Sequence, residues 1–391
     1  MKLRIGAAIV FAALLAAGCT GSTNEDSDPG RLVVVQADGN VAVVGPDGSD
    51  RVTLTSDGTP DLPYFQPIWS RDGSAVAYSR LGPQPTLNVT SVDGATKASI
   101  TTTSGTFYYS WSSQDDLLFL SNAAAGLRLD LTSFDGSDLT DPRTVATGAP
   151  LYFSWDPDGG RMATHISLDR FELSDLDRAT DLGPEPGVFQ APQWTDRGIV
   201  AVETHAGAPR LIVVSPDDGA VEPLATLIGP AYFVASPDGT RVAVQAITDE
   251  GDILSAIYQP IPAVPSNRLA VVDTERAEVT SVTNGLVLAF FWSPDGTRLL
   301  VLDVTPDGVA TWNVWDGDEL REVVQFRPAE TFVRNVLPFF DQYAQSMSLW
   351  SPDGSRFAFP GTIDGEEGIW VQPLDGERRL VSDGTWVSWS S

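Results

Sequence analysis

Histidine and cysteine, which carry much nucleophilic and metal chemistry, are scarce in this 391-residue chain: His165, His205 and Cys19 are the whole supply. A nucleophile needs a base that a third group holds in place. The sequence has no Gly-x-Ser-x-Gly turn and no Gly-x-x-x-x-Gly-Lys phosphate loop. Each histidine follows a tryptophan by about ten residues, near the expected end of a strand, where a structural role is expected. We therefore predict no catalytic residue, no histidine metal site and no enzyme.

Carboxylates are the one abundant reactive group, with 52 Asp and Glu residues against 24 Lys and Arg. Their oxygens bind calcium, and acidic residues gather in the runs 169–181, 316–319 and 364–367. None of these runs has the spacing of a twelve-residue calcium loop, so we predict no metal ion and no cofactor. A pair of carboxylates at the right separation also hydrolyses glycosides, which keeps one enzymatic alternative open.

The net charge of −28 limits the choice of partners. A negative field of this size repels phosphate backbones, so we exclude nucleic acid as a partner. It favours solubility, cations and basic partners, and a solvated acidic surface accounts for the same composition without any partner.

The first residues have the pattern of a secretory signal. Lys2 and Arg4 precede an apolar stretch of about 13 residues, Ile5–Ala17, which is too short to span a bilayer comfortably as a helix. The run then ends in Leu-Ala-Ala-Gly-Cys at Cys19. Residues 20–30 are polar and are expected to form a flexible tether.

The run that ends at Cys19 resembles the lipobox of bacterial lipoproteins. The resemblance implies that residues 1–19 are a lipoprotein signal peptide and that the Cys19 thiol carries a diacylglyceryl group. Ala16 departs from the leucine that is more common at its position. We expect a protein outside the cytoplasm, tethered to the cell membrane through a lipid anchor at Cys19.

One motif recurs along the chain: an aromatic residue, then Ser-Pro-Asp-Gly or a degraded form of it, then an apolar run. The copies begin at 69, 111, 155, 194, 235, 292 and 350, and Trp389 begins one more. The spacings between them are 42, 44, 39, 41, 57, 58 and 39 residues. A period near 40 with short strands is typical of β-propellers. Proline presets the first turn position and glycine takes a positive φ, so each motif is expected to be a turn between two strands.

The repeat predicts an all-β fold, a single β-propeller of four-stranded antiparallel blades over residues 31–391. We name the strands of a blade a, b, c and d, with the motif between a and b. Residues 32–54 have the pattern of strands b, c and d without an a, and 386–391 that of an a alone. Pairing them closes the ring and removes two open sheet edges. This gives eight blades, or seven if a weak copy such as that at Trp111 is no blade boundary. The motif tryptophans are expected to pack between blades.

These repeats resemble the TolB-like propeller repeats, relatives of the WD-repeat propellers, over about residues 31–391. The copies at 292 and 350 match the Trp-Ser-Pro-Asp-Gly pattern fully, and those at 111 and 194 are degraded. The segment 337–344 also looks like one in uncharacterised bacterial TolB-like proteins. The resemblance implies binding of a protein or ligand in the cell envelope, and it names no ligand.

The two long intervals hold insertions that strand parity assigns to one face. The insertion 248–267 connects strands b and c, and 327–348 connects strands d and a. Because successive antiparallel strands reverse direction, both connections leave from the same face of the disc. Loops on a rigid scaffold often carry binding. The candidate binding surface consists of Tyr258, Phe332, Arg334, Phe339, Phe340, Asp341 and Tyr343. The alternative is that the two insertions pack on each other as a lid.

Two functions from different classes follow. The first is a monomeric, membrane-tethered binding or scaffold protein that recognises an envelope protein or a small ligand on the face carrying both insertions. The alternative is a propeller enzyme, a glycoside hydrolase or lyase acting on extracellular glycans through carboxylates. A close, partly buried pair of carboxylates around the central channel would favour the enzyme.

Overall fold

The computed structural model describes residues 30–187, 189–248 and 261–390. The predicted signal peptide with Cys19, nearly all of the predicted tether, and Tyr258 lie outside the described residues. The described chain is all-β, with 31 strands, one four-residue α-helix and two further short helical segments. No helix in the described ranges is both long and apolar enough to cross a membrane.

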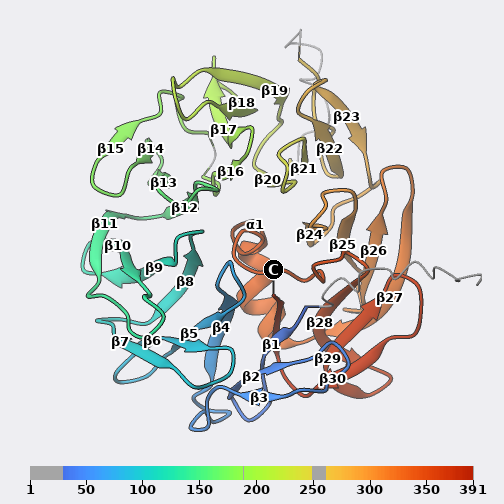
Figure 1. Cartoon of the computed structure of the whole chain (residues 1–391). Helices are drawn as coiled ribbons and strands as arrows, with labels where there is room; N and C mark the ends of the chain where they lie inside the picture. Colours follow the sequence, from blue (N-terminus) through green and yellow to red (C-terminus); the bar gives the residue numbers. More distant parts are fainter. Residues whose placement is uncertain (1–29, 188, 249–260, 391) are drawn as a thin grey trace, which may run out of the picture.

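The strands form antiparallel sheets that stand side by side around a central axis (Figure 1). Among the described residues there are six sheets of four strands and one of seven. The first three sheets in space are β31 (Trp386–Trp389) with β1 (Leu32–Val35), β2 (Val41–Val44) and β3 (Val52–Thr53); β4 (Tyr64–Trp69), β5 (Ala75–Arg80), β6 (Thr86–Ser91) and β7 (Lys97–Thr101); and β8 (Thr106–Trp111), β9 (Asp116–Ala123), β10 (Gly126–Ser133) and β11 (Arg143–Gly148).

The next three sheets repeat the same order from the inner to the outer strand. They are β12 (Leu151–Trp155), β13 (Met162–Ile166), β14 (Arg170–Ser174) and β15 (Ala179–Asp181); β16 (Gln193–Thr195), β17 (Gly198–His205), β18 (Ala208–Val214) and β19 (Val221–Thr226); and β20 (Ala231–Ala235), β21 (Arg241–Ala246), β22 (Leu269–Asp273) and β23 (Glu278–Ser281).

The seven-stranded sheet spans two repeats. Its strands are β24 (Ala289–Trp292), β25 (Leu299–Val304), β26 (Ala310–Trp315), β27 (Leu320–Pro328), β28 (Arg356–Ile363), β29 (Glu366–Pro373) and β30 (Arg379–Ser382). The two halves join because the end of β27 pairs with β28 through Arg327 and Pro328. In the second half the inner position is taken by Trp350, which bridges to Phe357 in β28.

The two ends of the described chain meet in one sheet. Strand β31 pairs antiparallel with β1, with Leu32 opposite Trp389 and Val35 opposite Trp386. On its other side β1 pairs with β2. The inner strand of this sheet therefore comes from the end of the chain and the other three from its beginning.

The motif forms its turn through local hydrogen bonds. Ser236 Oγ donates to Asp238 Oδ1 at 2.5 Å, and the same oxygen accepts from the Thr240 amide at 3.1 Å. Gly239 takes a φ of +68°, a conformation that favours glycine. The same Ser–Asp bond occurs at Ser293–Asp295 and Ser351–Asp353. The turn is thus encoded within a few residues and recurs wherever the motif does.

Four of the seven motif tryptophans connect one repeat to the repeat before it. Their indole N–H groups donate to a carbonyl of the preceding inner strand: Trp69 to Ser388 at 3.1 Å, Trp155 to Ser110 at 3.0 Å, Trp292 to Val234 at 2.9 Å and Trp350 to Phe291 at 3.1 Å. In each case the acceptor directly precedes the motif residue of that strand. Trp69 makes this bond to the last strand of the chain.

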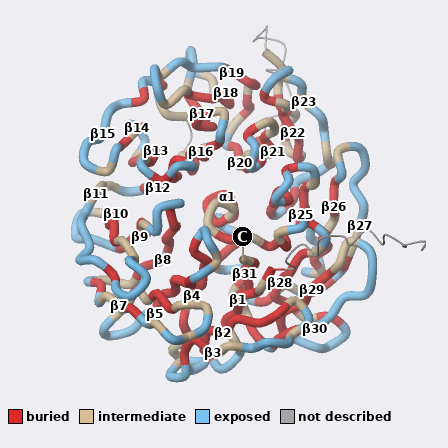
Figure 2. Tube along the Cα trace, in the orientation of Figure 1, coloured by how far each residue is buried: buried red, intermediate tan, exposed pale blue. Residues whose placement is uncertain are grey.

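The insertion 327–348 turns inward. After β27 the chain forms a π-helical turn η1 (Phe332–Val336), a 3₁₀ turn η2 (Leu337–Phe339) and the helix α1 (Phe340–Tyr343). Figure 1 places α1 in the middle of the ring, and Figure 2 shows the centre of the molecule as largely buried. We call residues 329–349 the central segment.

The ring has two faces. The connections between strands d and a, which precede β4, β8 and β12, lie on one face, which we call the insertion face. The motif turns between strands a and b lie on the other, the turn face. The central segment enters from the insertion face, since it follows the outer strand β27.

Candidate functional site

Aromatic contacts hold the central segment against the inner strands. The ring of Phe340 lies 4.8 Å from that of Phe290 in β24 and 5.8 Å from that of Tyr232 in β20, measured between centroids. Tyr343 lies 5.6 Å from Tyr108 in β8 and 5.7 Å from Trp386 in β31. Pairs in this range stabilise beyond the area they bury, so α1 is fixed from opposite sides of the ring.

Hydrogen bonds also join α1 to the inner strands. Two backbone carbonyls of α1 accept: that of Gln342 from Tyr108 Oη at 3.1 Å, and that of Asp341 from Gln193 Nε2 at 3.4 Å. Two side chains of α1 donate to carbonyls of the ring, Gln342 Nε2 to Phe153 at 3.2 Å and Tyr343 Oη to Phe107 at 3.2 Å, and the Tyr343 hydroxyl accepts from Gln66 Nε2. With the aromatic contacts, α1 touches β4, β8, β12, β16, β20, β24 and β31. The central segment is therefore a plug across the channel.

The structure corrects part of the predicted binding surface. Phe332, Phe340, Asp341 and Tyr343 are buried, so the interpretation of Phe340 and Tyr343 as exposed anchors is wrong. Their apolar surface is buried against the inner strands of the ring, and no partner can reach it in this conformation.

Arg334 and Phe339 stay at the surface. Phe339 is 48% exposed. Arg334 pairs with Glu330 at 2.6 Å, with 74% of its side chain exposed. Tyr258 lies outside the described residues. The binding role of Arg334 and Phe339 stays a prediction.

An apolar groove of about 410 Å³ opens on the insertion face beside these two residues. We define the apolar groove by residues in or next to β5, β8, β10 and β12 and in the central segment, chiefly Leu81, Phe107, Leu127, Pro150, Tyr152, Arg334 and Phe339. Leu81 is 38% exposed and Phe107 37%. Three exposed large apolar side chains, counting Phe339, thus share one hollow. Such clustering on a soluble surface marks an interaction site more often than single exposed residues do.

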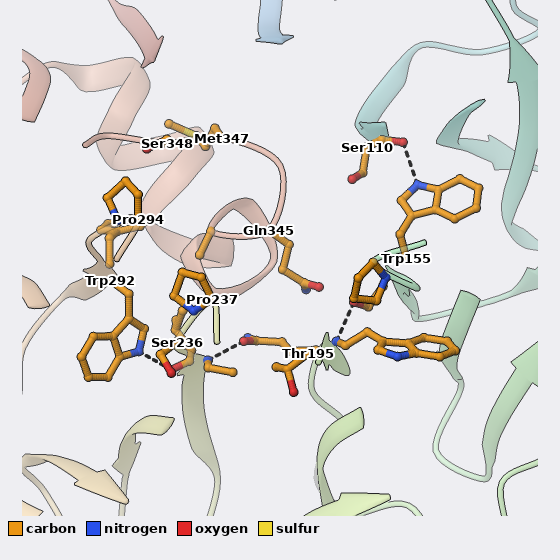
Figure 3. Close-up of a pocket in the computed structure, with 18 of the residues that line it drawn as sticks. Ser110, Trp155, Thr195, Ser236, Pro237, Trp292, Pro294, Gln345, Met347 and Ser348 are labelled. Carbon is orange, nitrogen blue, oxygen red and sulfur yellow. Dashed lines mark hydrogen bonds between the residues drawn. The ribbon is translucent and has the colours of Figure 1, made fainter. Parts of the chain in front are cut away.

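A second cavity, of about 500 Å³, opens on the turn face. Figure 3 shows its wall of motif residues, with Gln345 extending into it from the central segment. The third positions of six motif copies line it: Arg71, Pro157, Asp196, Pro237, Pro294 and Pro352. Residues of the central segment from Ala344 to Leu349 also line it. We call this the turn-face cavity.

The sequence pattern predicted the binding surface on the insertion face alone. Arg71 and Asp196 were therefore missed. The signal that would have found them lies in the repeat, because both stand in the slot that proline fills in four other copies. Asp196 is the one carboxylate residue among those lining the turn-face cavity. The described lining thus holds no close pair of carboxylates.

The remaining candidate groups have structural contacts. His165 lies buried in β13, where its Nδ1 is 3.0 Å from the Gln190 carbonyl and its ring centroid is 4.6 Å from that of Phe189. Burial lowers its pKa, which favours the neutral ring. His205 ends β17 and is exposed. Across the described ranges, no group of three or more His, Cys, Asp and Glu side chains is arranged to hold a metal ion.

Asp341 is the buried charge of the plug. It is 3% exposed and takes part in none of the ion pairs found between described residues. Burial raises its pKa to about 6. The tyrosines near it, Tyr108 and Tyr152, both have pKa values raised by burial and stay neutral at physiological pH.

Solved structures share this fold. The β-propeller domain of the Trilobed protease from Pyrococcus furiosus matches with a TM-score of 0.51 and 12% identity, over 82% of this chain and 98% of that chain. An oligogalacturonate lyase in complex with manganese matches with a TM-score of 0.55 and 12% identity, over 89% of this chain and 99% of that chain. The fold is a β-propeller. This confirms the fold class predicted from the repeat.

TolB from Acinetobacter baumannii is a further match, with a TM-score of 0.44 and 15% identity over 93% of this chain and 67% of that chain. At such identities likeness shows the fold alone. No family model and no curated protein sequence matches the chain.

The buried carboxyl of Asp341 predicts a pH-dependent stability. Its pKa is 3.8 when exposed and about 6 in the fold, so the folded state binds the proton more tightly. The stability that the protonated carboxyl contributes is fully present below the pKa of the unfolded state, 3.8, and it is lost as pH rises through the folded pKa of about 6. The difference between the two pKa values corresponds to a loss of folding free energy on the order of 3 kcal/mol above about pH 6.

Asp341→Asn removes that charge, so the variant is expected to melt at a higher temperature than the wild type at about pH 8, with a smaller gain at about pH 4. Thermal unfolding at both pH values measures this. A gain that is equal at the two pH values, or a loss at about pH 8, contradicts the role of the buried charge.

Proposed function

We propose that the protein is a lipid-anchored binding protein outside the cytoplasm, with an eight-bladed propeller whose insertion face recognises an apolar segment of another envelope protein. The observation that carries this proposal is the apolar groove with its exposed Leu81, Phe107 and Phe339. It lies on the face to which strand parity assigned the insertions, beside the central segment.

The blade count rests on the sheets. Six four-stranded sheets account for six blades, and the seven-stranded sheet divides at the β27–β28 contact into two more. The pairing of β31 with β1 supports closure of the ring by the C-terminal strand. The outer strands of the four-stranded sheets remain as short edges, so the loops of the two faces are the larger surfaces for a partner.

The shape and chemistry of the groove favour a protein segment over a polar small molecule. Its walls are mostly Leu, Phe, Pro and Tyr, and its charged member, Arg334, is already paired with Glu330. Large apolar and aromatic anchors dominate the energetics of protein interfaces.

The glycan-cleaving alternative gains no support from the described cavity. The likeness to an oligogalacturonate lyase concerns the fold, and the residues lining the turn-face cavity include a single carboxylate, Asp196. Carboxylate catalysis of glycoside hydrolysis uses two.

Anchoring rests on residues 1–19 and is tested at Cys19. Cells fed a labelled fatty acid are expected to label the wild type and not Cys19→Ala, and the variant is expected to leave the membrane fraction. A Ser110→Ala variant, far from the signal sequence, serves as the control. Equal labelling of wild type and Cys19→Ala contradicts the anchor.

The groove is tested at Phe339. A partner is recovered from native membranes by a photo-crosslinker placed at Phe107, identified, and titrated against purified protein. Phe339→Ala is expected to weaken its binding about tenfold, because truncating an aromatic anchor costs more than about 1 kcal/mol.

Leu320→Ala is the matched control for Phe339→Ala. Leu320 is 36% exposed and begins β27 at a hairpin on the turn face. If the two variants weaken binding equally, or neither does, the groove is not the contact surface.

A further inference from the structure

A smaller recess adjoins the turn-face cavity. It measures about 170 Å³ and shares Arg71, Ser110, Gln345 and Ser348 with that cavity. Its other walls include Trp111 and Trp389, the motif tryptophans of β8 and β31. We call it the donor recess.

Three residues that line the recess carry hydrogen-bond donors that have no acceptor among the described residues. The indole nitrogens of Trp111 and Trp389 and the Nε2 atom of Gln345 are buried without a partner in the described structure. At the equivalent motif position, Trp69, Trp155, Trp292 and Trp350 donate to a carbonyl of the preceding strand. Buried donors are nearly always paired in native proteins. The two motif indoles that are buried without an acceptor both lie in the walls of this recess.

Arg71 adds a positive charge to these donors. Its side chain forms no hydrogen bond or ion pair with any residue in the described ranges. Nearby protein atoms partly desolvate the guanidinium and lower its pKa. The residue as a whole is exposed to solvent. No Asp or Glu lines the donor recess. In a chain of net charge −28, Arg71 thus lines a recess without a carboxylate in its wall, and the one carboxylate residue of the adjoining turn-face cavity is Asp196.

The repeat gives independent support. Arg71 fills the third motif position, where Pro157, Pro237, Pro294 and Pro352 stand in other copies. Proline suits the first position of the turn, and three copies lack it, with Arg71, Ser113 and Asp196 in its place; Arg71 is the one basic residue among them. A departure from the turn chemistry of the chain's own repeat, at a position lining a cavity, points to a role for the side chain itself.

We propose that the turn-face cavity binds a small organic anion, with its carboxylate or phosphate oxygens in the donor recess against Arg71 and Gln345. Arginine presents several donors in a planar fork that matches both oxyanions, and the amide of Gln345 supplies a further donor. The cavity volume of about 500 Å³ falls within the range of small-molecule sites. Its proline and tryptophan walls suit the apolar body of the ligand. This site lies on the face opposite the apolar groove, so it stands independently of the proposed protein partner.

The test uses isothermal titration of the full mature chain with three probes at low ionic strength: inorganic phosphate, acetate and succinate, with chloride at matched ionic strength as the reference. Wild type is expected to bind phosphate or the carboxylates with a measurable heat. Binding of phosphate alone identifies a phosphoryl ligand, and binding of acetate or succinate identifies a carboxylate. Both results support an oxyanion site.

Two variants separate the site from general charge effects. Arg71→Gln is expected to weaken the binding at least tenfold, and Gln345→Leu severalfold. Arg379→Gln, which removes an exposed arginine from β30, is expected to leave it unchanged. Arg71 lies in a surface turn, so its substitution is expected to leave the fold intact. The melting temperature of the Arg71→Gln variant checks this. Failure of the wild type to bind any of the probes, or equal binding by wild type and Arg71→Gln, overturns the proposal.

Discussion

The hydrogen bond from a motif tryptophan to the preceding inner strand is the interaction on which the rest of the structure depends. Each sheet is held internally by its own ladder, but nothing in a ladder fixes one sheet to the next. The indole of Trp155 spans that gap to the Ser110 carbonyl, and that of Trp69 spans it where the two ends of the chain meet. A single bond of this kind contributes about 0.5–1.5 kcal/mol, and four of them join neighbouring inner strands in the described structure.

The inner strands in turn surround a central space, which is either filled by protein or left as a channel. The central segment fills it, with Phe340 and Tyr343 packed against opposite sides and the buried carboxyl of Asp341 between neutral tyrosines. This plug divides the axis into two hollows of different chemistry. The apolar groove faces the insertion side, and the turn-face cavity carries Arg71 and unpaired donors on the other. One scaffold thus presents two separate surfaces.

The repeat predicted the sheets and turns because their causes are local. The bond from Ser236 to Asp238 spans two residues, and the positive φ of Gly239 follows from the same short sequence. The inward path of the insertion was not predictable in this way. Gln66 and Tyr343, which are bonded, are 277 residues apart. Phe340 and Tyr343 have the same apolar character whether they anchor a partner or fill a channel, and only their contacts with the inner strands decide between the two. Arg71 was visible as a departure from the repeat, but its cavity was not.

The most direct measurement compares Trp69→Phe with Trp111→Phe in thermal or denaturant unfolding. Both side chains are buried, at 6% and 3% exposure, and both substitutions remove the same atoms. Trp69 loses its bond to Ser388, whereas Trp111 has no acceptor to lose. The account predicts that Trp69→Phe costs about 1 kcal/mol more than Trp111→Phe. Equal costs, or a larger cost at Trp111, would contradict the claim that these indole bonds hold the ring together.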